Sequence, residues 1–338
     1  MTDQALNERR LVSVIIPTYN RESVILEALE SVMAQSYRPL EIVVVDDGST
    51  DTTVERIRDW WGEIRDPHLS LLVEAHSHRG AAAARNVGIL RATGEFIQFL
   101  DSDDLLHSEK IQQQLTALQR HPECSVARCY HVLDRCTSTS HGSQRDYIGA
   151  VTVEGLLERP IRTGWSYLFH RSIFIDDAKR GRGLRWREDL FVFQDIALLA
   201  DLSLMYSAKV VTVCAELYTY RTHLPDRIGS DIATPLGVHR RIRALNKIFG
   251  NSRVASSAWG GELCYVLWRY VYQIGSLREL LSFLTLVAKV PLRPRVRFNF
   301  AVKIIARIVG GRRGYQILRQ TFLFSFHSVK VFHVLRDS

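Results

Sequence analysis

The sequence has no uninterrupted apolar stretch of the roughly 18 residues that a membrane-spanning helix needs. Segment 1–10 is polar and carries both charges, without the apolar centre of a secretory signal, so we expect no signal peptide. The five cysteines include no Cys-x-x-Cys pair, and their odd number favours a reducing compartment over a disulfide framework. Together these absences predict a cytoplasmic protein.

Two common phosphate-binding patterns are also missing. After the apolar segment 11–16 the chain continues Pro17-Thr18-Tyr19-Asn20, where a dinucleotide-binding fold would have GxGxxG. The Walker pattern GxxxxGK[ST] does not occur either. The charge of a nucleotide phosphate would therefore have to be neutralised by a metal ion and by a side chain such as Arg85.

Apolar runs alternate with segments of helical periodicity through the first hundred residues. The runs at 11–16, 41–45, 69–73 and 96–100 are typical of buried strands, and the segments between them have apolar residues at helical spacing. Asn20 is expected to cap the first helix. This alternation predicts an α/β protein with a mostly parallel sheet flanked by helices.

Polar residues follow the predicted strands at the point where each strand ends. Asp46 and Asp47 follow the second strand, and Asp101, Ser102 and Asp103 follow the fourth. Ligands of open parallel sheets bind at this edge, and carboxylates gathered there repel each other unless a cation lies among them. A divalent ion with oxygen ligands, Mn²⁺ or Mg²⁺, is therefore expected. The alternative is that each segment is only a turn or a helix cap.

Four segments, in this order, resemble the motifs of the large glycosyltransferase family 2. They are Val12-Ser-Val-Ile-Ile-Pro-Thr-Tyr-Asn20, Val43-Val-Val-Asp-Asp-Gly-Ser-Thr-Asp51, Gly80-Ala-Ala-Ala-Ala-Arg-Asn-Val-Gly88 and Phe99-Leu-Asp-Ser-Asp-Asp104. The resemblance covers about residues 11–230 and is weaker in the second half. It implies the GT-A fold and an enzyme of the type that builds bacterial cell-surface polysaccharides.

The resemblance also implies roles for the residues that match these motifs. Pro17, Thr18, Tyr19 and Asn20 would line the nucleotide base, and Asp46 would bind it, with Asp47 nearby. Arg85 would face the base or the phosphates. Asp101 and Ser102 would lie by the ribose and the metal, Asp103 would coordinate the metal, and Asp104 would lie behind them or cap a helix that begins at Leu105.

The acceptor half resembles the family less closely. Trp186-Arg-Glu-Asp-Leu190 followed by Gln194-Asp195 is similar to its acidic motif, which implies Asp195 as the catalytic base and leaves Asp189 as its rival. Gln194 departs from the more common glutamate, and the alternative role for Asp195 is to cap a helix from Ile196. The remaining acceptor or loop residues implied by the resemblance are Trp165, Glu188, Gln194, Arg221 and His223, of which His223 is equally well explained as a surface histidine.

The resemblance implies an inverting transfer of a sugar from a nucleotide-diphosphate sugar, with UDP favoured, to an acceptor hydroxyl on a glycan or a lipid-linked molecule. Two alternatives stay open. A sugar nucleotidyltransferase would need a glycine-rich, lysine-bearing loop in place of Pro-Thr-Tyr-Asn. A non-catalytic member would bind the nucleotide or a partner and transfer nothing.

The basic charge of the chain is concentrated at its C-terminal end. Residues 279–338 hold eleven Lys or Arg and two acids, a net charge of +9, so the rest of the chain sums to −1. We predict a catalytic domain over 1–231, divided into a nucleotide-binding half (11–105) and an acceptor half (106–231), and a basic helical extension over 232–338. Basic residues beside an apolar face favour contact with an anionic membrane surface, on the inner face of the cell membrane. The alternatives are a helical cap with a solvated basic face, and nucleic-acid binding, for which no recognition motif is present.

Overall fold

The computed structural model describes residues 10–133, 147–150, 166–176, 181–206 and 208–221, together with residues 240, 243, 244, 247 and 248. The chain divides into two compact units, residues 1–230 and 231–338. Trp165, His223 and nearly all of the predicted extension 232–338 lie outside the described residues. The functional division into halves and the role of the extension stay predictions.

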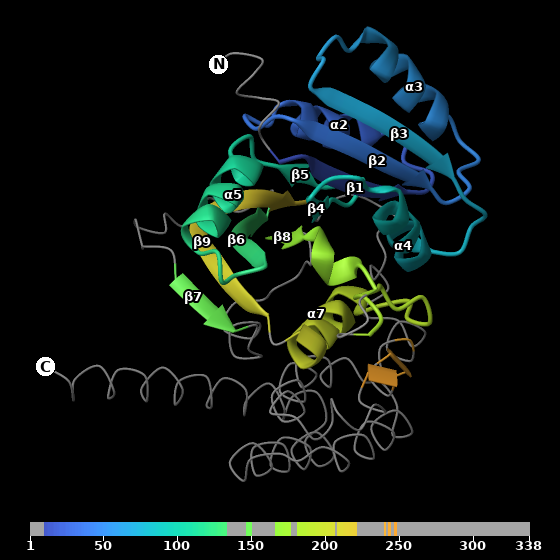
Figure 1. Cartoon of the computed structure of the whole chain (residues 1–338). Coiled ribbons are helices and arrows are strands. Elements are labelled where there is room, and N and C mark those ends of the chain that lie inside the picture. Colours follow the sequence, from blue (N-terminus) through green and yellow to red (C-terminus); the bar gives the residue numbers. More distant parts are fainter. Residues whose placement is uncertain are drawn as a thin grey trace, which may run out of the picture. The chain divides into compact units, whose positions relative to one another are not determined.

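A mixed sheet forms the centre of the first unit (Figure 1). Within the described ranges its strands follow the order β3-β2-β1-β4-β8-β6-β9-β5, and β7 pairs with β9. The strands are β1 (Val12–Thr18), β2 (Leu40–Asp46), β3 (Leu69–Ala75), β4 (Phe96–Phe99), β5 (Leu105–Leu106), β6 (Val126–Leu133), β7 (Tyr147–Ala150), β8 (Tyr167–His170) and β9 (Lys209–Tyr220).

The first half of the sheet is parallel, as predicted. In β1 and β2 every residue is buried, because helices cover both faces of these strands. Their register places Thr18 beside Asp46 and Asp46 beside Ala75, so β1, β2 and β3 end at one edge. The second half is mixed: β8 is antiparallel to β4 and β6, whereas β9 is parallel to β6.

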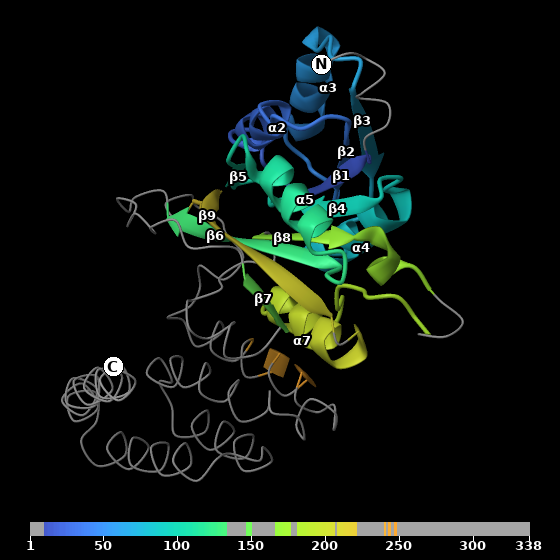
Figure 2. The ribbon, with the colours of Figure 1, turned by 60° about the vertical axis from the view of Figure 1, so that its left-hand side comes forward.

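Helices cover both faces of the parallel half (Figure 2). They are α2 (Ile25–Met33), α3 (Thr53–Glu63) and α4 (Ala81–Arg91), followed by α5 (Lys110–Arg120), the 3₁₀ helix η2 (Arg171–Phe174) and α7 (Gln194–Tyr206). Right-handed crossovers put α2 and α3 on one face and α4 on the other. In the part of the chain that the structure describes, no helix is long and apolar enough to cross a membrane.

One helix start differs from the sequence-based expectation. Asn20 does not cap α2, which begins at Ile25. It adopts a left-handed conformation (φ 49°), and its side-chain oxygen accepts a hydrogen bond of 2.8 Å from the amide of Thr50. This hydrogen bond joins the loop after β1 to the loop after β2. Asparagine suits the position, because it adopts positive φ more readily than most residues and its side chain readily binds backbone groups.

Lys110 lies fully buried beneath the sheet, which is unusual for a lysine. Its ammonium group donates to the side-chain oxygens of Gln98 in β4 and Gln114 in α5. The amide of Gln114 in turn donates to the carbonyl oxygens of Ala127 and Ser166, at 3.0 and 2.9 Å. Burial lowers the pKa of Lys110 to about 8. These bonds fix α5 against the sheet.

Candidate active site

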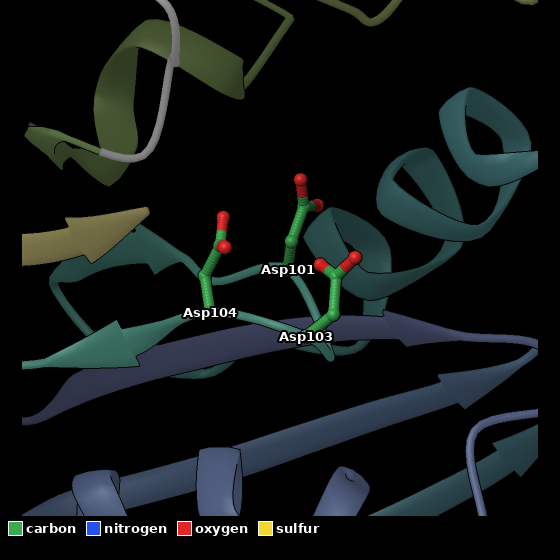
Figure 3. Close-up of side chains that lie close together, drawn as sticks. All are labelled: Asp101, Asp103 and Asp104. Carbon is green, nitrogen blue, oxygen red and sulfur yellow. The ribbon is translucent and has the colours of Figure 1, made fainter. Parts of the chain in front are cut away.

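Three carboxylates gather where β4 ends. Asp101, Asp103 and Asp104 each offer an oxygen atom, and these oxygens lie within 4.8 Å of one another. Figure 3 shows the three side chains extending from one short loop toward a common region. Hard oxygen donors at this spacing fit a divalent cation such as Mg²⁺ or Mn²⁺. The acidic cluster, as we call these three residues, is thus suited to the predicted metal.

Asp104 is held by strand β9. It is completely buried, and its carboxylate accepts one hydrogen bond from the Tyr218 hydroxyl and another, of 2.9 Å, from the amide of Arg221. The expectation that it caps a helix from Leu105 is wrong, because β5 follows it and α5 begins only at Lys110. Tyr218 is buried as well, and its burial, together with the charge of Asp104, raises the pKa of the Tyr218 hydroxyl well above its usual value. Asp101 and Asp103 are therefore the candidates for direct metal coordination.

Asp46 and Asp47, predicted near the base, are both buried at the end of β2. Asp46 accepts hydrogen bonds from the amide and the hydroxyl group of Ser49, which closes the turn after the strand. Asp47 accepts from the amides of Arg79 and Gly80, at 2.8 and 2.7 Å. Because Gly80 immediately precedes α4, Asp47 fixes the start of that helix. Contact of Asp46 with a base stays a prediction, and the structure gives Asp47 a structural role.

The end of β1 lies beside this turn. Pro17 and Thr18 are buried in the strand, and the Thr18 hydroxyl has no hydrogen-bond partner among the described residues. Tyr19 is 39% exposed, and its ring centroid lies 4.2 Å from that of His78. Sequence reasoning did not single out His78, because no motif marks it. The only available signal was its position shortly after the third predicted strand.

Arg85 joins the acidic cluster to the acceptor half. It is 5% exposed and reaches out from α4. One terminal nitrogen donates to Asp101 Oδ1 and the other to Gln194 Oε1, both at 2.8 Å. Its guanidinium carbon lies 4.7 Å from the centre of the Trp186 ring, a cation–π contact. The sequence-based role at the base or the phosphates stays untested, and the structure adds a bridge that the sequence did not predict.

The neighbouring residue, Asn86, holds the segment that leads to Asp195. Its side-chain oxygen accepts from the amide of Trp186, and its side-chain nitrogen donates to the Trp186 carbonyl, both at 2.9 Å. Glu188 accepts from Asn86 at 3.0 Å and from Arg79 at 2.7 Å. Glu188 is thus engaged with α4 and the loop before it. Sequence reasoning missed Arg79 and Asn86.

Asp195 lies in the first turn of α7. Its side chain is partly exposed, but the surrounding protein removes most of its water, and this desolvation raises its pKa to about 6. The amide of Ile196 and the charge of Arg85 oppose the rise, whereas the charge of Asp101 adds to it. A carboxylate with this pKa is suited to accept a proton near neutral pH. Its rival Asp189 is exposed and pairs with Arg187 at 3.4 Å.

The backbone just before Asp195 is strained. Phe193 has φ 60°, a left-handed conformation that bulky residues rarely adopt and that costs on the order of 1–3 kcal/mol. Such outliers persist where the surrounding contacts hold them in place. Here Gln194 donates a hydrogen bond of 2.7 Å to the Leu190 carbonyl across this turn. The turn that presents Asp195 is therefore fixed by side-chain contacts.

Arg221 lies beneath the acidic cluster. Its Nε donates to the carbonyl of Asp103 at 2.6 Å, and one terminal nitrogen pairs with Glu27 at the start of α2. The side chain is buried. The resemblance implied that Arg221 is one of the acceptor or loop residues. In the structure Arg221 supports the loop that carries Asp101 and Asp103, and no sequence pattern pointed to Glu27 as its partner.

Comparisons with known proteins agree with this geometry. The profile of glycosyl transferase family 2 matches residues 13–177. The glycosyltransferase GlyG of Streptococcus pneumoniae is 33% identical over 232 residues, which cover 62% of this chain and 70% of GlyG. The chain belongs to glycosyltransferase family 2. Its fold class, predicted from the alternating segments and the four motifs, is thereby confirmed.

This family 2 glycosyltransferase also resembles proteins with named substrates. The UDP-Glc:alpha-D-GlcNAc-diphosphoundecaprenol beta-1,3-glucosyltransferase WfgD of Escherichia coli is 39% identical over 108 residues, 32% of this chain and 41% of WfgD. Staphylococcus aureus TarS 1–349, crystallised with UDP-GlcNAc, has a TM-score of 0.63 at 20% identity and 92% coverage of both chains. The fold is therefore shared with TarS. The chain spans only 19–44% of the length of four further glycosyltransferase relatives.

Proposed function

We propose that this glycosyltransferase transfers a sugar from a UDP-linked donor to an acceptor hydroxyl, with inversion at the anomeric carbon. The observation that carries the proposal is the link through Arg85, which connects the acidic cluster to Gln194, the residue before the desolvated Asp195. The ligand of TarS and the donor in the name of WfgD, UDP-GlcNAc and UDP-Glc, support the choice of UDP.

The donor would be held at the ends of β1 and β4. Tyr19 offers an exposed ring on which the nucleotide base can stack. The buried Thr18 hydroxyl offers a hydrogen-bonding group that has no partner among the described residues. Asp101 and Asp103 would hold a divalent cation, which neutralises the diphosphate and stabilises it as a leaving group. Arg221 and Asp104 keep the loop of these two carboxylates in place.

The base would be Asp195. Its carboxylate takes the proton of the acceptor hydroxyl while the hydroxyl oxygen attacks the anomeric carbon. The bond from that carbon to the diphosphate oxygen breaks, and its electron pair leaves with the nucleoside diphosphate. One displacement from the opposite face inverts the configuration. With a pKa of about 6, Asp195 is mostly ionised at pH 7, yet it is a stronger base than an ordinary aspartate.

The acceptor would be a glycan or a lipid-linked molecule of cell-surface polysaccharide or glycolipid synthesis. This rests on the diphosphoundecaprenol acceptor in the name of WfgD and on the net charge of +9 in residues 279–338. A basic extension would bring the enzyme to the anionic inner face of the membrane. Co-sedimentation with vesicles of phosphatidylcholine alone and with added phosphatidylglycerol tests this contact, and equal binding to both would contradict it.

Calorimetry with UDP, GDP and dTDP, with and without Mn²⁺, tests the donor site. We expect metal-dependent binding of UDP that is lost in Asp103→Asn, because the neutral amide removes the charge that holds the cation. Asp59→Asn, an exposed position in α3, is the matched control and should bind like the wild type. A folded wild type that binds none of the three nucleotides would contradict the proposal and favour a non-catalytic member.

Turnover separates an enzyme from a nucleotide-binding protein. We expect UDP release from UDP-sugars, slowly to water and faster with a suitable acceptor, and its loss in Asp195→Asn. Nucleotide binding should survive in Asp195→Asn, because Asp195 lies in the acceptor half. Turnover that persists in Asp195→Asn would contradict the assignment of the base.

A further inference from the structure

The side chain of Gln194 uses both ends of its amide. Its oxygen accepts a hydrogen bond of 2.8 Å from Arg85, and its nitrogen donates one of 2.7 Å to the Leu190 carbonyl. A guanidinium group can only donate and a carbonyl oxygen can only accept, so these two partners fix the orientation of the amide. Asp195, the proposed base, is the next residue in the chain.

A glutamate at position 194 would keep only one of these bonds. Its carboxylate would still accept from Arg85, but it has no hydrogen atom to donate to Leu190. Two oxygen atoms would then face each other across the turn that contains Phe193, whose φ of 60° needs support from its surroundings. The glutamine is therefore fitted to this turn by its hydrogen-bonding pattern, and the isosteric glutamate is not.

The other side of the contact leads to the acidic cluster. Arg85 is buried and donates to Asp101 at 2.8 Å, so Asp101, Arg85 and Gln194 form a continuous hydrogen-bonded chain across the site. The chain joins the loop after β4 to the first turn of α7, which are 93 positions apart between Asp101 and Gln194. A ligand that binds to Asp101 will therefore change the hydrogen bond between Asp101 and Arg85.

We propose that Gln194 is a positioning residue: through Arg85 and Leu190 it holds Asp195 at a fixed place relative to the acidic cluster and transmits occupancy of that cluster to the turn before α7. This inference rests on the proposed function. It predicts that Gln194→Glu lowers kcat by on the order of 10- to 100-fold, because small displacements of a reacting group have effects of this size. The KM of the donor should change less than threefold, since the hydrogen bonds of the Gln194 side chain go to Arg85 and Leu190 and not to the acidic cluster.

Two measurements on the full-length chain test the inference. The first compares kcat and KM for UDP release from UDP-sugars in the wild type and Gln194→Glu. The second follows hydrogen exchange in peptides covering residues 188–206 with and without UDP and Mn²⁺. Gln112→Glu, which makes the same change of charge on α5, where the side chain binds Thr116, is the matched control. Gln194→Met removes both hydrogen bonds without adding charge, and serves if the glutamate variant does not fold.

In the wild type and Gln112→Glu we expect UDP and Mn²⁺ to slow exchange in this peptide. In Gln194→Glu or Gln194→Met that response should be lost although calorimetry still detects UDP binding, and kcat should fall. A Gln194 variant with wild-type kcat and an unchanged exchange response would overturn the inference and leave the proposed function standing. A wild type without UDP binding or turnover would instead overturn the proposed function, and the inference with it.

Discussion

The hydroxyl group of Tyr218, near the end of β9, donates a hydrogen bond to the carboxylate of Asp104, which lies 114 positions earlier in the chain. Both side chains are buried, and the amide of Arg221 supplies the second bond to Asp104. A buried carboxylate needs such donors, because its charge is costly to remove from water. The acidic cluster therefore depends on a strand of the acceptor half for its shape.

Replacing Tyr218 with phenylalanine should destabilise the protein. The substitution removes a hydrogen-bond donor to a buried charge, which costs on the order of 1.5–3 kcal/mol in the free energy of unfolding. Tyr37→Phe is the matched control: Tyr37 is also buried, but its hydroxyl binds a neutral carbonyl, that of Arg10, so its loss should be about 0.5–1.5 kcal/mol. Urea denaturation measures both, and equal losses would contradict the importance of the charge.

Activity should depend on pH through Asp195. Burial raises the pKa of this carboxyl from its ordinary 3.8 to about 6, and only the ionised form accepts a proton. The value of kcat should therefore fall about tenfold per pH unit below pH 6 and level off above it. A pH profile of single-turnover rates measures this, and a profile that is flat from pH 5 to 7 would show that Asp195 does not limit the chemical step.

The same pKa predicts a stability change in Asp195→Asn. Because the folded-state pKa is the higher one, the folded protein binds the proton more tightly, and stability from this group falls as pH rises from about 4 through 6. Asparagine removes this cost, so the variant should be more stable than the wild type at pH 7.5. The gain is at most about 3 kcal/mol, since the side chain keeps some exposure. A less stable variant at that pH would contradict the desolvation of Asp195.

Two helical glycines should respond oppositely to alanine. A Cβ atom at Gly88 in α4 would lie 2.3 Å from the Ile15 side chain, whereas one at Gly62 in α3 has no atom within 4 Å. We expect Gly88→Ala to destabilise the fold by roughly 1–3 kcal/mol through overpacking. Gly62→Ala should stabilise it by about 0.5–1 kcal/mol through higher helix propensity. Thermal unfolding compares them, and an unaffected Gly88→Ala would show that α4 is free to move away from β1.

Lys110 should make stability depend on alkaline pH. Its pKa is about 8 when folded and near 10.5 when unfolded, so the unfolded chain binds more protons between these values and stability from this group rises with pH there. Lys110→Met keeps the approximate volume and removes the titration. The free energy of unfolding of the wild type minus that of the variant should grow by roughly 2–3 kcal/mol from pH 8 to pH 10. A constant difference would mean that Lys110 keeps its charge in the core.

Much of the nucleotide-binding half could be predicted from the sequence. Its strands are runs of apolar residues that need burial on both faces, and its carboxylates follow those runs directly, so chain order alone brings Asp46 and Asp101 to one edge. The acceptor half was harder to predict. Its strands form both parallel and antiparallel pairs, and β5, with two residues, carries too little pattern to be recognised.

The sequence by itself determined the fold class of the first half and the placement of Asp101 and Asp103 directly after β4, because local patterns specify strands, helices and the ends between them. Only the tertiary structure decided how those side chains are used. Arg85 meets Gln194, and Asp104 meets Tyr218, across more than a hundred positions of the chain. Asp47 accepts hydrogen bonds from the two backbone amides just before α4, a contact that no residue spacing in the sequence predicts. Contacts between distant segments follow from the packing of the whole sheet, and it is this packing that brings the charge of Asp101, in the loop after β4, to bear on Asp195.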